Sequence, residues 1–329
     1  MTAAGQEVPY YAFYPGGATE VSPLVSVPGD RAFPAKGNFL LTTVALGKTT
    51  VLELFSGWLD PDVDIVTEAQ LLGDQTPAQF SQVQAQAIDD SKQVAIAVAL
   101  RRLGLEVPIT GAGALVEQVV PGSPAAQTLS PGDTVVNAAG QPVGTVEDLR
   151  AAVAGRSPGE VIELQVVGAD GQTRASSVTL IECPEGFDCP GGGRAALGLG
   201  LRTKDQKFGW PFEVGIESKD IGGPSAGLAF TLTVIDLLSP GELSGGRSVA
   251  VTGTMDLDGT VGAIGGVGQK AAAVRALGID VFLVPEANAV QARDHAGDDL
   301  VIIPVKDLES ALVALGRLGG DLAALGSAP

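Results

Sequence analysis

The chain has few of the residues that bind metals or cross-link small domains. Its 329 residues include two cysteines, one histidine, two methionines and two tryptophans. One histidine and one close cysteine pair do not make up the four-ligand sets that structural zinc requires. We therefore expect no metal ion and no cofactor.

Positive charge and long apolar runs are also scarce. The chain carries 38 acidic against 20 basic residues, a formal net charge of −18, so its surface repels phosphate backbones and excludes nucleic acid as a partner. The longest apolar run covers only residues 94–100, whereas a membrane-spanning helix needs about 20 residues. Because no basic segment followed by an apolar one opens the sequence, either the protein is cytosolic or a targeting segment lies outside it.

The two cysteines lie close together in the segment CPEGFDCP, as Cys183 and Cys189. The prolines and the glycine between and beside them favour a turn, so a short local disulfide is one interpretation. A disulfide would imply an oxidising compartment. A pair of free thiols in a loop is the alternative.

Residues 1–75 form a strand-containing segment, in which the apolar runs 38–46 and 50–59 are interpreted as edge strands of a larger unit. The sequence GKTT at 47–50 resembles the end of a phosphate-binding loop. Thr42 stands where that loop needs a glycine, so we expect no nucleotide there. Start signals at Thr76 and Pro77 and a stop signal at Gly104 predict one or two helices over 77–103, within a helical connector of residues 76–106.

Residues 107–182 change to short β runs separated by turn residues. The stretch VVPGSPAAQTLSPGDTVVNAAGQPVGTVEDLRAAVAG carries a small-residue turn, PGD before a strand, a hairpin and a helix. In that order it resembles a bacterial PDZ domain, which implies a β-sandwich or barrel with helices. In that family a glycine-containing loop binds the C-terminal carboxylate of a peptide that adds as a β-strand. The resemblance places this role on GAGALV, residues 111–116, with Gly111, Gly113, Ala114 and Leu115; a spacer without ligand is the alternative.

Residues 183–194 are rich in glycine and proline and are predicted to be a linker. Beyond them, residues 195–329 alternate apolar strands with helical segments, which is typical of an α/β or α+β domain. The whole chain is therefore predicted to be an α+β multidomain protein.

The most informative local sequence is IGGPSAGLAF, residues 221–230. Pro224 suits the first turn of a helix, so Ser225 is expected at a helix N-terminus. Unpaired N–H groups and the positive end of the helix dipole would stabilise an oxyanion there.

A reactive serine needs a base, and His295 is the first candidate. GPSAG fits G-x-S-x-G, and Asp256 or Asp280 followed by His295 gives the Ser, Asp, His order of α/β-hydrolases. However, the nucleophile elbow requires a strand that leads directly into the first glycine, and the strand-like VGI ends at residue 216. His295 lies in the polar stretch ARDHAGDD, so we interpret it as a surface residue.

Lys270 is the second candidate base. It opens the largely apolar segment AAAVRALG. Apolar packing removes hydration from an ammonium group and lowers its pKa from near 10.4, and the neutral amine can then deprotonate a serine.

GGPSAG, followed by VTGTMDLDGTVGAIGGVGQKAAAVRALGID and VFLVPEAN, resembles the proteolytic domain of Lon-type serine peptidases over residues 195–315. The resemblance implies a Ser/Lys dyad of Ser225 and Lys270, with Thr252 orienting the lysine. Backbone N–H groups at Ser225 and near Gly223 would hold the oxyanion. Two departures stand out: the family's acid after TG is Thr254 here, and the stretched KDIGG puts an active-site role for Asp220 in doubt.

The order of an aromatic opening, a PDZ-like middle and a Lon-like end resembles the membrane-anchored PDZ-containing Lon-like peptidases of the bacterial envelope. This resemblance implies an ATP-independent serine endopeptidase that acts on flexible or unfolded protein segments. It also implies a location outside the cytoplasm, with membrane contact only through an N-terminal anchor absent from this chain. A non-catalytic PDZ scaffold or sensor and a Ser/Asp/His esterase are the alternatives.

Overall fold

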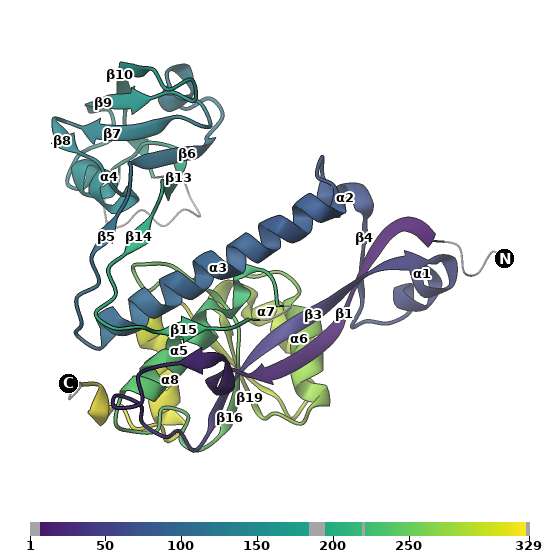
Figure 1. Cartoon of the computed structure of the whole chain (residues 1–329). Helices are drawn as coiled ribbons and strands as arrows, with labels where there is room; N and C mark the ends of the chain where they lie inside the picture. The colour runs from purple at the N-terminus through teal and green to yellow at the C-terminus, as the bar shows by residue number, and fades with distance from the viewer. Residues whose placement is uncertain (1–6, 184–194, 219–220, 327–329) are drawn as a thin grey trace. The chain divides into compact units, whose positions relative to one another are not determined.

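The computed structural model describes residues 7–183, 195–218 and 221–326, and the chain divides into two compact units (Figure 1). Residues 1–107 and 210–329 form the first, here called the split unit. Residues 108–209 form the second, the inserted unit. The predicted boundaries differ from this division. Residues 195–209 belong with the PDZ-like segment, and both the N-terminal segment and the helical connector belong with the Lon-like segment.

The split unit is built on a six-stranded sheet in the order β20-β19-β16-β3-β1-β4. β3, β16, β19 and β20 run parallel, while β1 runs antiparallel to both β3 and β4. The bounds of these strands are Glu7–Glu20 for β1, Asn38–Thr50 for β3, Asp64–Thr67 for β4, Ser248–Val251 for β16, Val281–Pro285 for β19 and Val301–Val305 for β20.

The expectation of an edge strand at 38–46 is wrong, because β3 pairs with β1 on one side and with β16 on the other. Its side chains Phe39 and Leu41 are fully buried. The N-terminal segment therefore contributes to the same sheet as the Lon-like segment, which explains why the two form one unit.

The strand expected at 50–59 is also wrong, since Val51–Trp58 form the helix α1. The Thr50 hydroxyl accepts a hydrogen bond from the Glu53 N–H, and the Glu53 carboxylate accepts one from the Thr50 N–H. This reciprocal capping starts a helix directly at the end of β3. A short apolar run does not by itself distinguish a strand from a helix.

Residues Pro77–Arg102 form one continuous helix, α3, which begins at the predicted cap, Thr76. α3 packs against α5 and is therefore more than a connector. The other helices of the split unit are α2 (Glu68–Leu72), α5 (Gly227–Leu238), α6 (Val267–Ala276), α7 (Ala289–Asp294) and α8 (Leu308–Arg317), with 3-10 turns η2 (Ser22–Leu24), η5 (Pro224–Ala226), η6 (Glu286–Asn288) and η7 (Ala323–Gly326).

Two short strand pairs complete the split unit. β2 (Val25–Ser26) pairs with β15 (Gly215–Ile216), and β17 (Thr254–Met255) pairs with β18 (Val261–Gly262). None of the helices in the described ranges has the length and apolarity needed to cross a bilayer.

The inserted unit has a sheet in the order β10-β9-β7-β6-β13, with β8 paired to β7. Its elements are β5 (Ile109–Thr110), β6 (Ala114–Val119), η3 (Pro124–Gln127), β7 (Thr134–Ala138), β8 (Gln141–Pro142), α4 (Val146–Val153), β9 (Val161–Val167), β10 (Thr173–Thr179), β11 (Ile181–Glu182), β12 (Ala195–Ala196), β13 (Leu199–Thr203) and β14 (Lys207–Phe208). A separate core of small and branched side chains fills it. The expected mixed α+β architecture is confirmed, and the inserted unit has the short strands and the helix expected over residues 107–182.

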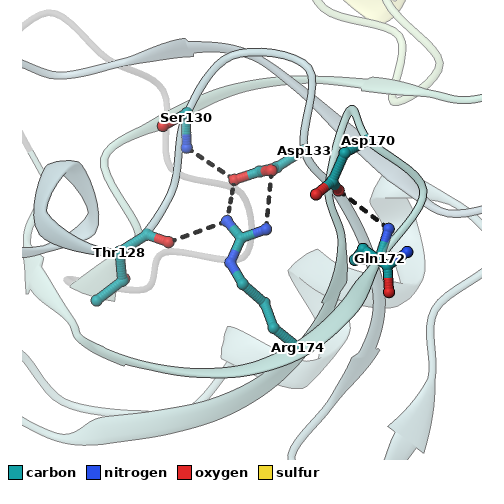
Figure 2. A network of polar contacts seen from close by, with 6 residues as sticks. All are labelled: Thr128, Ser130, Asp133, Asp170, Gln172 and Arg174. Atoms are coloured by element: carbon teal, nitrogen blue, oxygen red, sulfur yellow. Dashed lines mark hydrogen bonds and ion pairs between the residues drawn. The ribbon is translucent and has the colours of Figure 1, made fainter.

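The PGD segment of the inserted unit has a clear structural role (Figure 2). The Asp133 carboxylate accepts hydrogen bonds from both terminal guanidinium nitrogens of Arg174, at 3.1 and 2.5 Å, and from the Ser130 N–H at 2.8 Å. The same guanidinium donates to the Thr128 carbonyl. Because Asp133 is buried and Arg174 belongs to β10, this two-point ion pair fixes the turn before β7 to the far edge of the sheet.

Candidate functional site

Ser225 lies in the 3-10 turn η5, which leads directly into α5. Pro224 occupies the first position of the turn, as predicted. Gly223 precedes it with φ +83° and ψ 158°, a backbone conformation that L side chains rarely adopt. The Ser225 side chain is half-buried and the helix behind it is almost entirely buried.

The loop after β16 holds the Ser225 backbone in place. The Ser225 carbonyl accepts from the Gly253 N–H at 2.9 Å and from the Thr252 hydroxyl at 3.2 Å. The Gly253 carbonyl in turn accepts from the Leu228 N–H at 3.1 Å. Thr252, which is fully buried, thus lies beside the turn that carries Ser225.

Lys270 comes from the first turn of α6, a helix that begins after Gly266 in the left-handed conformation. Its side chain is 2% exposed. The Lys270 Nζ lies 2.7 Å from the Ser225 Oγ and 3.0 Å from the Thr252 Oγ1. The structure therefore brings together the three side chains that the sequence proposed for the reaction.

Burial lowers the pKa of Lys270 from 10.5 to about 7. Water is removed from the ammonium group, and its two partners are hydroxyls, which carry no charge to stabilise it. Near neutral pH a large fraction of the amine is therefore uncharged and able to accept the Ser225 proton.

The oxyanion role expected for Gly223 does not fit the structure, because its N–H donates to the carbonyl of Gln84 at 2.9 Å. The Ser225 N–H, by contrast, has no hydrogen-bond acceptor among the described residues. Asp220, in doubt from the sequence, lies outside the described ranges.

His295 is half-buried rather than a surface residue, and the carboxylate at its Nδ1 is that of Asp62, not of Asp256 or Asp280. Its Nδ1 lies 2.8 Å from the Asp62 Oδ1, and its side chain is 20% exposed. The Asp62 carboxylate also accepts a hydrogen bond from the Arg275 guanidinium at 2.7 Å. A Cβ placed on Gly268 would lie 2.8 Å from the imidazole ring, so the ring packs against α6. The Asp62–His295 pair joins the loop after α1 to α6 and α7, which accounts for the histidine without catalysis.

The peptide-binding role expected for Gly111, Gly113, Ala114 and Leu115 is contradicted, because hydrogen bonds within the chain already use this backbone. The Gly113 N–H donates to the Gly144 carbonyl, and Ala114 and Leu115 lie in β6, which pairs with both β7 and β13. Gly111 is closely packed, since a Cβ on it would lie 2.6 Å from the Gly144 carbonyl oxygen, and the next N–H, that of Ala112, donates to the Lys204 carbonyl at 2.8 Å.

β13 is one of the two edge strands of this sheet, the other being β10: it pairs with β6 and has no second neighbour among the described strands. α4 lies beside it, and the N–H of its first residue, Val146, donates to the buried Thr203 hydroxyl at 3.0 Å. Half-buried apolar side chains from both elements pack against the core; we call them the β13–α4 surface: Leu199, Leu201, Ala152 and Val153.

Cys183 is disulfide-bonded. Cys189 lies outside the described residues, so the Cys183–Cys189 pairing stays a prediction.

Sequence reasoning missed two residues of α3 that contact the segment of residues 223–225, which leads into η5 and carries Ser225. The Gln84 carbonyl accepts from Gly223, and the Ser91 hydroxyl donates to the Pro224 carbonyl at 3.1 Å. Neither residue could be found from the sequence, because a backbone carbonyl can belong to any residue and a single serine in a long helix forms no motif.

Comparison with known proteins agrees with this site. Residues 214–315 match the Lon protease (S16) C-terminal proteolytic domain, and residues 94–180 match the PDZ domain. The Lon protease of Rickettsia bellii is 34% identical over 121 residues, which cover 36% of this chain and 15% of that protein. The archaeal Lon protease of Methanocaldococcus jannaschii is 39% identical over 89 residues, which cover 27% of this chain and 13% of that protein.

Among solved structures, the PDZ domain of the SdrC-like protein from Listeria monocytogenes aligns with a TM-score of 0.25 and 17% identity, over 28% of this chain and 90% of that one. The chain matches only about 15% or less of the length of these two Lon proteases. The family matches nevertheless establish the two domains. The chain contains a Lon-type proteolytic domain of the serine peptidase class and a PDZ domain.

Proposed function

We propose that this protein is an ATP-independent serine endopeptidase in which Ser225 is the nucleophile and Lys270 the general base. The observation that supports this most strongly is the 2.7 Å contact between the Ser225 Oγ and a Lys270 amine that is 2% exposed. A buried neutral amine at hydrogen-bond distance is the arrangement that nucleophilic catalysis by a serine requires.

The reaction divides into two proton-balanced halves. In the first, the Ser225 Oγ attacks the peptide carbonyl carbon while the Lys270 Nζ takes its proton, and the resulting ammonium returns that proton to the leaving amine. In the second, Lys270 deprotonates a water that attacks the acyl ester, and then returns the proton to the Ser225 Oγ. The Thr252 hydroxyl, which donates to the Ser225 carbonyl, directs its free lone pair to the Lys270 Nζ and keeps the amine aimed at the serine.

Independence from nucleotide is supported by the course of the chain at GKTT. Residues 47–50 are extended within β3, where the Lys48 Nζ forms ion pairs with carboxylate oxygens of Glu7 and Glu68 at 4.0 and 3.6 Å. The phosphate-cradling loop that this motif would need is therefore replaced by a paired strand. Without a nucleotide-driven step, the substrates we propose are flexible or unfolded protein segments.

A comparison of active-site variants tests this function. Cleavage of an unfolded protein and labelling by a fluorophosphonate should both be lost in Ser225→Ala and Lys270→Ala, with circular dichroism unchanged. His295→Ala should keep both if it folds, because its partners are Asp62 and the face of α6. Wild-type protein that neither cleaves nor is labelled would favour the scaffold alternative, and inactivation by folded His295→Ala alone would favour the esterase.

We further propose that the inserted unit binds the C-terminus of a protein substrate along the β13–α4 surface. Among the strands that the structure describes, β13 has one free backbone edge, and the half-buried apolar side chains beside it suit the last residues of an extended peptide.

Fluorescence anisotropy on Ser225→Ala protein tests this proposal. A labelled unstructured peptide with a free carboxylate should bind better than its amidated form, and Ala152→Glu should weaken that binding. Ala151→Glu on the exposed side of α4 is the matched control. Equal binding of both peptide forms would rule out carboxylate recognition.

We also propose a location outside the bacterial cytoplasm, with any membrane contact made by an anchor that precedes this sequence. The disulfide at Cys183 supports an oxidising compartment. Mass spectrometry of unreduced protein from its host should find no alkylatable thiol; two free thiols would contradict this location.

A further inference from the structure

The helix α3 contacts residues 223–225, here called the nucleophile turn, at two points. In the sequence, α3 comes before the matched proteolytic domain of residues 214–315. The Gln84 carbonyl holds the Gly223 N–H at 2.9 Å, and the Ser91 Oγ donates to the Pro224 carbonyl at 3.1 Å. Gln84 and Ser91 are two helical turns apart and share one face of α3.

The packing around these contacts is close enough to require glycine. A Cβ placed on Gly227 would lie 3.0 Å from the Ser91 Oγ and 2.9 Å from the Met255 N. A Cβ on Gly223 would lie 2.9 Å from the Gln84 Oε1. Ser91 itself is 6% exposed, so its hydroxyl is enclosed between α3 and the first turn of α5.

Two successive carbonyl groups of the nucleophile turn are therefore held by different elements. Ser91 of α3 holds the Pro224 carbonyl, and the loop after β16 holds the Ser225 carbonyl through Thr252 and Gly253. Fixing the peptide groups on both sides of the Ser225 Cα sets the direction in which its Oγ points. Lys270 comes from a third element, α6. The 2.7 Å contact between its Nζ and the Ser225 Oγ therefore depends on the hydrogen bonds that fix the two carbonyl groups.

We propose that Ser91 is a positioning residue of the peptidase, which acts through the Pro224 carbonyl to aim Ser225 at Lys270. The inference rests on the function proposed above. Ser91 does not enter the proton transfers; it narrows the orientations that the nucleophile turn can adopt. The peptidase site of this chain therefore includes α3 as well as the Lon-type segment.

Ser91→Ala in the full chain tests the proposal. We expect kcat on a short peptide to fall about fivefold, the effect of one lost hydrogen bond, with KM changed less than twofold. The rate of fluorophosphonate labelling should fall by the same factor. The pH midpoint of activity should not move, because the surroundings of Lys270 are unchanged. Ser81→Ala, at an exposed position of the same helix, is the matched control and should match wild type.

Ser91→Cys provides a graded second variant, since a thiol is similar in size and a weaker donor. Its kcat should lie between those of wild type and Ser91→Ala, and it decides the question if Ser91→Ala does not fold. Wild-type kcat in a folded Ser91 variant that removes or weakens the donor would overturn the positioning role. Wild-type protein that fails to cleave or to be labelled would instead overturn the proposed function, so the two failures are distinguishable.

Discussion

The lowered pKa of Lys270 comes from the burial of its amine rather than from a charged neighbour. Two hydroxyls lie within hydrogen-bond distance of its amine, the neighbouring residues of α6 are buried, and no ion pair to it is found within the described ranges. Neutral partners leave burial as the cause of its lowered pKa. In the proposed mechanism, the base is therefore largely uncharged near neutral pH before a substrate binds.

Activity should rise with pH through a midpoint near 7. Lys270 must be uncharged to accept the Ser225 proton, and its pKa is lowered to about 7, so protonation below that value removes the base. Initial rates on a short peptide between pH 5 and 9 measure this midpoint. Lys270→Arg should stay inactive across the range, since a guanidinium does not deprotonate; a midpoint above pH 9 in wild type would contradict a buried neutral base.

Thr252→Val should lower kcat by roughly tenfold while the protein stays folded. The change keeps the shape of the side chain but removes the hydroxyl that accepts from Lys270 and donates to the Ser225 carbonyl. Steady-state kinetics beside thermal unfolding measure the effect. Thr233→Val is the matched control, because that buried hydroxyl donates to the Ala229 carbonyl of its own helix. Equal losses in both variants would argue against an orienting role.

Part of the site was predictable at this scale, and the rest was not. Ser225 and Lys270 stand in motifs whose chemistry can be reasoned from helix starts and apolar surroundings. The Gly223 prediction was wrong because its N–H bonds a carbonyl from α3, more than 100 residues earlier in the chain. Backbone contacts between distant segments leave no residue pattern.

At the scale of single elements, the capping residues were more informative than apolar runs. Thr76 marked the start of α3, whereas the run 50–59 suggested a strand and forms α1. In α1 the decisive signal was Thr50 with Glu53, the spacing of a capping box. The apolar run 38–46 did give a strand, but its position inside the sheet depends on β16, which lies about 200 residues later.

The helix α5, which follows Ser225, contains an unpaired acid that should weaken the fold at neutral pH. Asp236 is 3% exposed and accepts one N–H, from Leu243 at 2.8 Å, and burial raises the pKa of its carboxyl to about 6. Because the folded state binds this proton more tightly than the unfolded state, stability is lost as pH rises from about 4 through 6. The loss corresponds to about 3 kcal/mol in the free energy of unfolding.

Asp236→Asn should therefore stabilise the protein at pH 7, because the amide oxygen still accepts from Leu243 and no charge is buried. Urea unfolding at pH 7 and pH 4 measures the difference, which should shrink at the lower pH. Asp258→Asn is the matched control, since that exposed carboxylate also accepts one backbone N–H, from Thr260 at 3.0 Å. A destabilised Asp236→Asn at pH 7 would show that the carboxylate is stabilised by its surroundings.

At the scale of the whole molecule, the sequence of one unit is inserted into the sequence of the other. The sequence suggested domains in linear order, yet β1, β3 and α3 belong to the unit of Ser225, and β13 completes the sheet of the inserted unit. Linear boundaries followed changes in composition, and composition does not reveal which strand pairs with which. The split unit closes only after the chain has passed through the inserted unit.

The two ends of the inserted unit lie side by side. Ile109 pairs with Phe208 between β5 and β14, and the Gly209 N–H donates to the Pro108 carbonyl at 2.8 Å. Its core is formed by residues from its own segment. Residues 108–209 can therefore be removed and Val107 joined to Trp210 by a short glycine-serine linker. Deletion of 107–180 alone would instead leave β13 and β14 without their partner strands, β6 and β5.

Excision of residues 108–209 should leave fluorophosphonate labelling and short-peptide hydrolysis within about twofold of wild type, because Ser225, Thr252, Lys270 and α3 all remain. Cleavage of a long unfolded substrate should fall much further, by tenfold or more, since a tethered binding unit raises the local substrate concentration. Rates on both substrates for the excised protein, wild type and full-length Ala152→Glu measure the effect. Ala152→Glu should reproduce the selective loss. Loss of both activities on excision would mean that the inserted unit supports the fold of the split unit, and loss of neither would remove its role in substrate delivery.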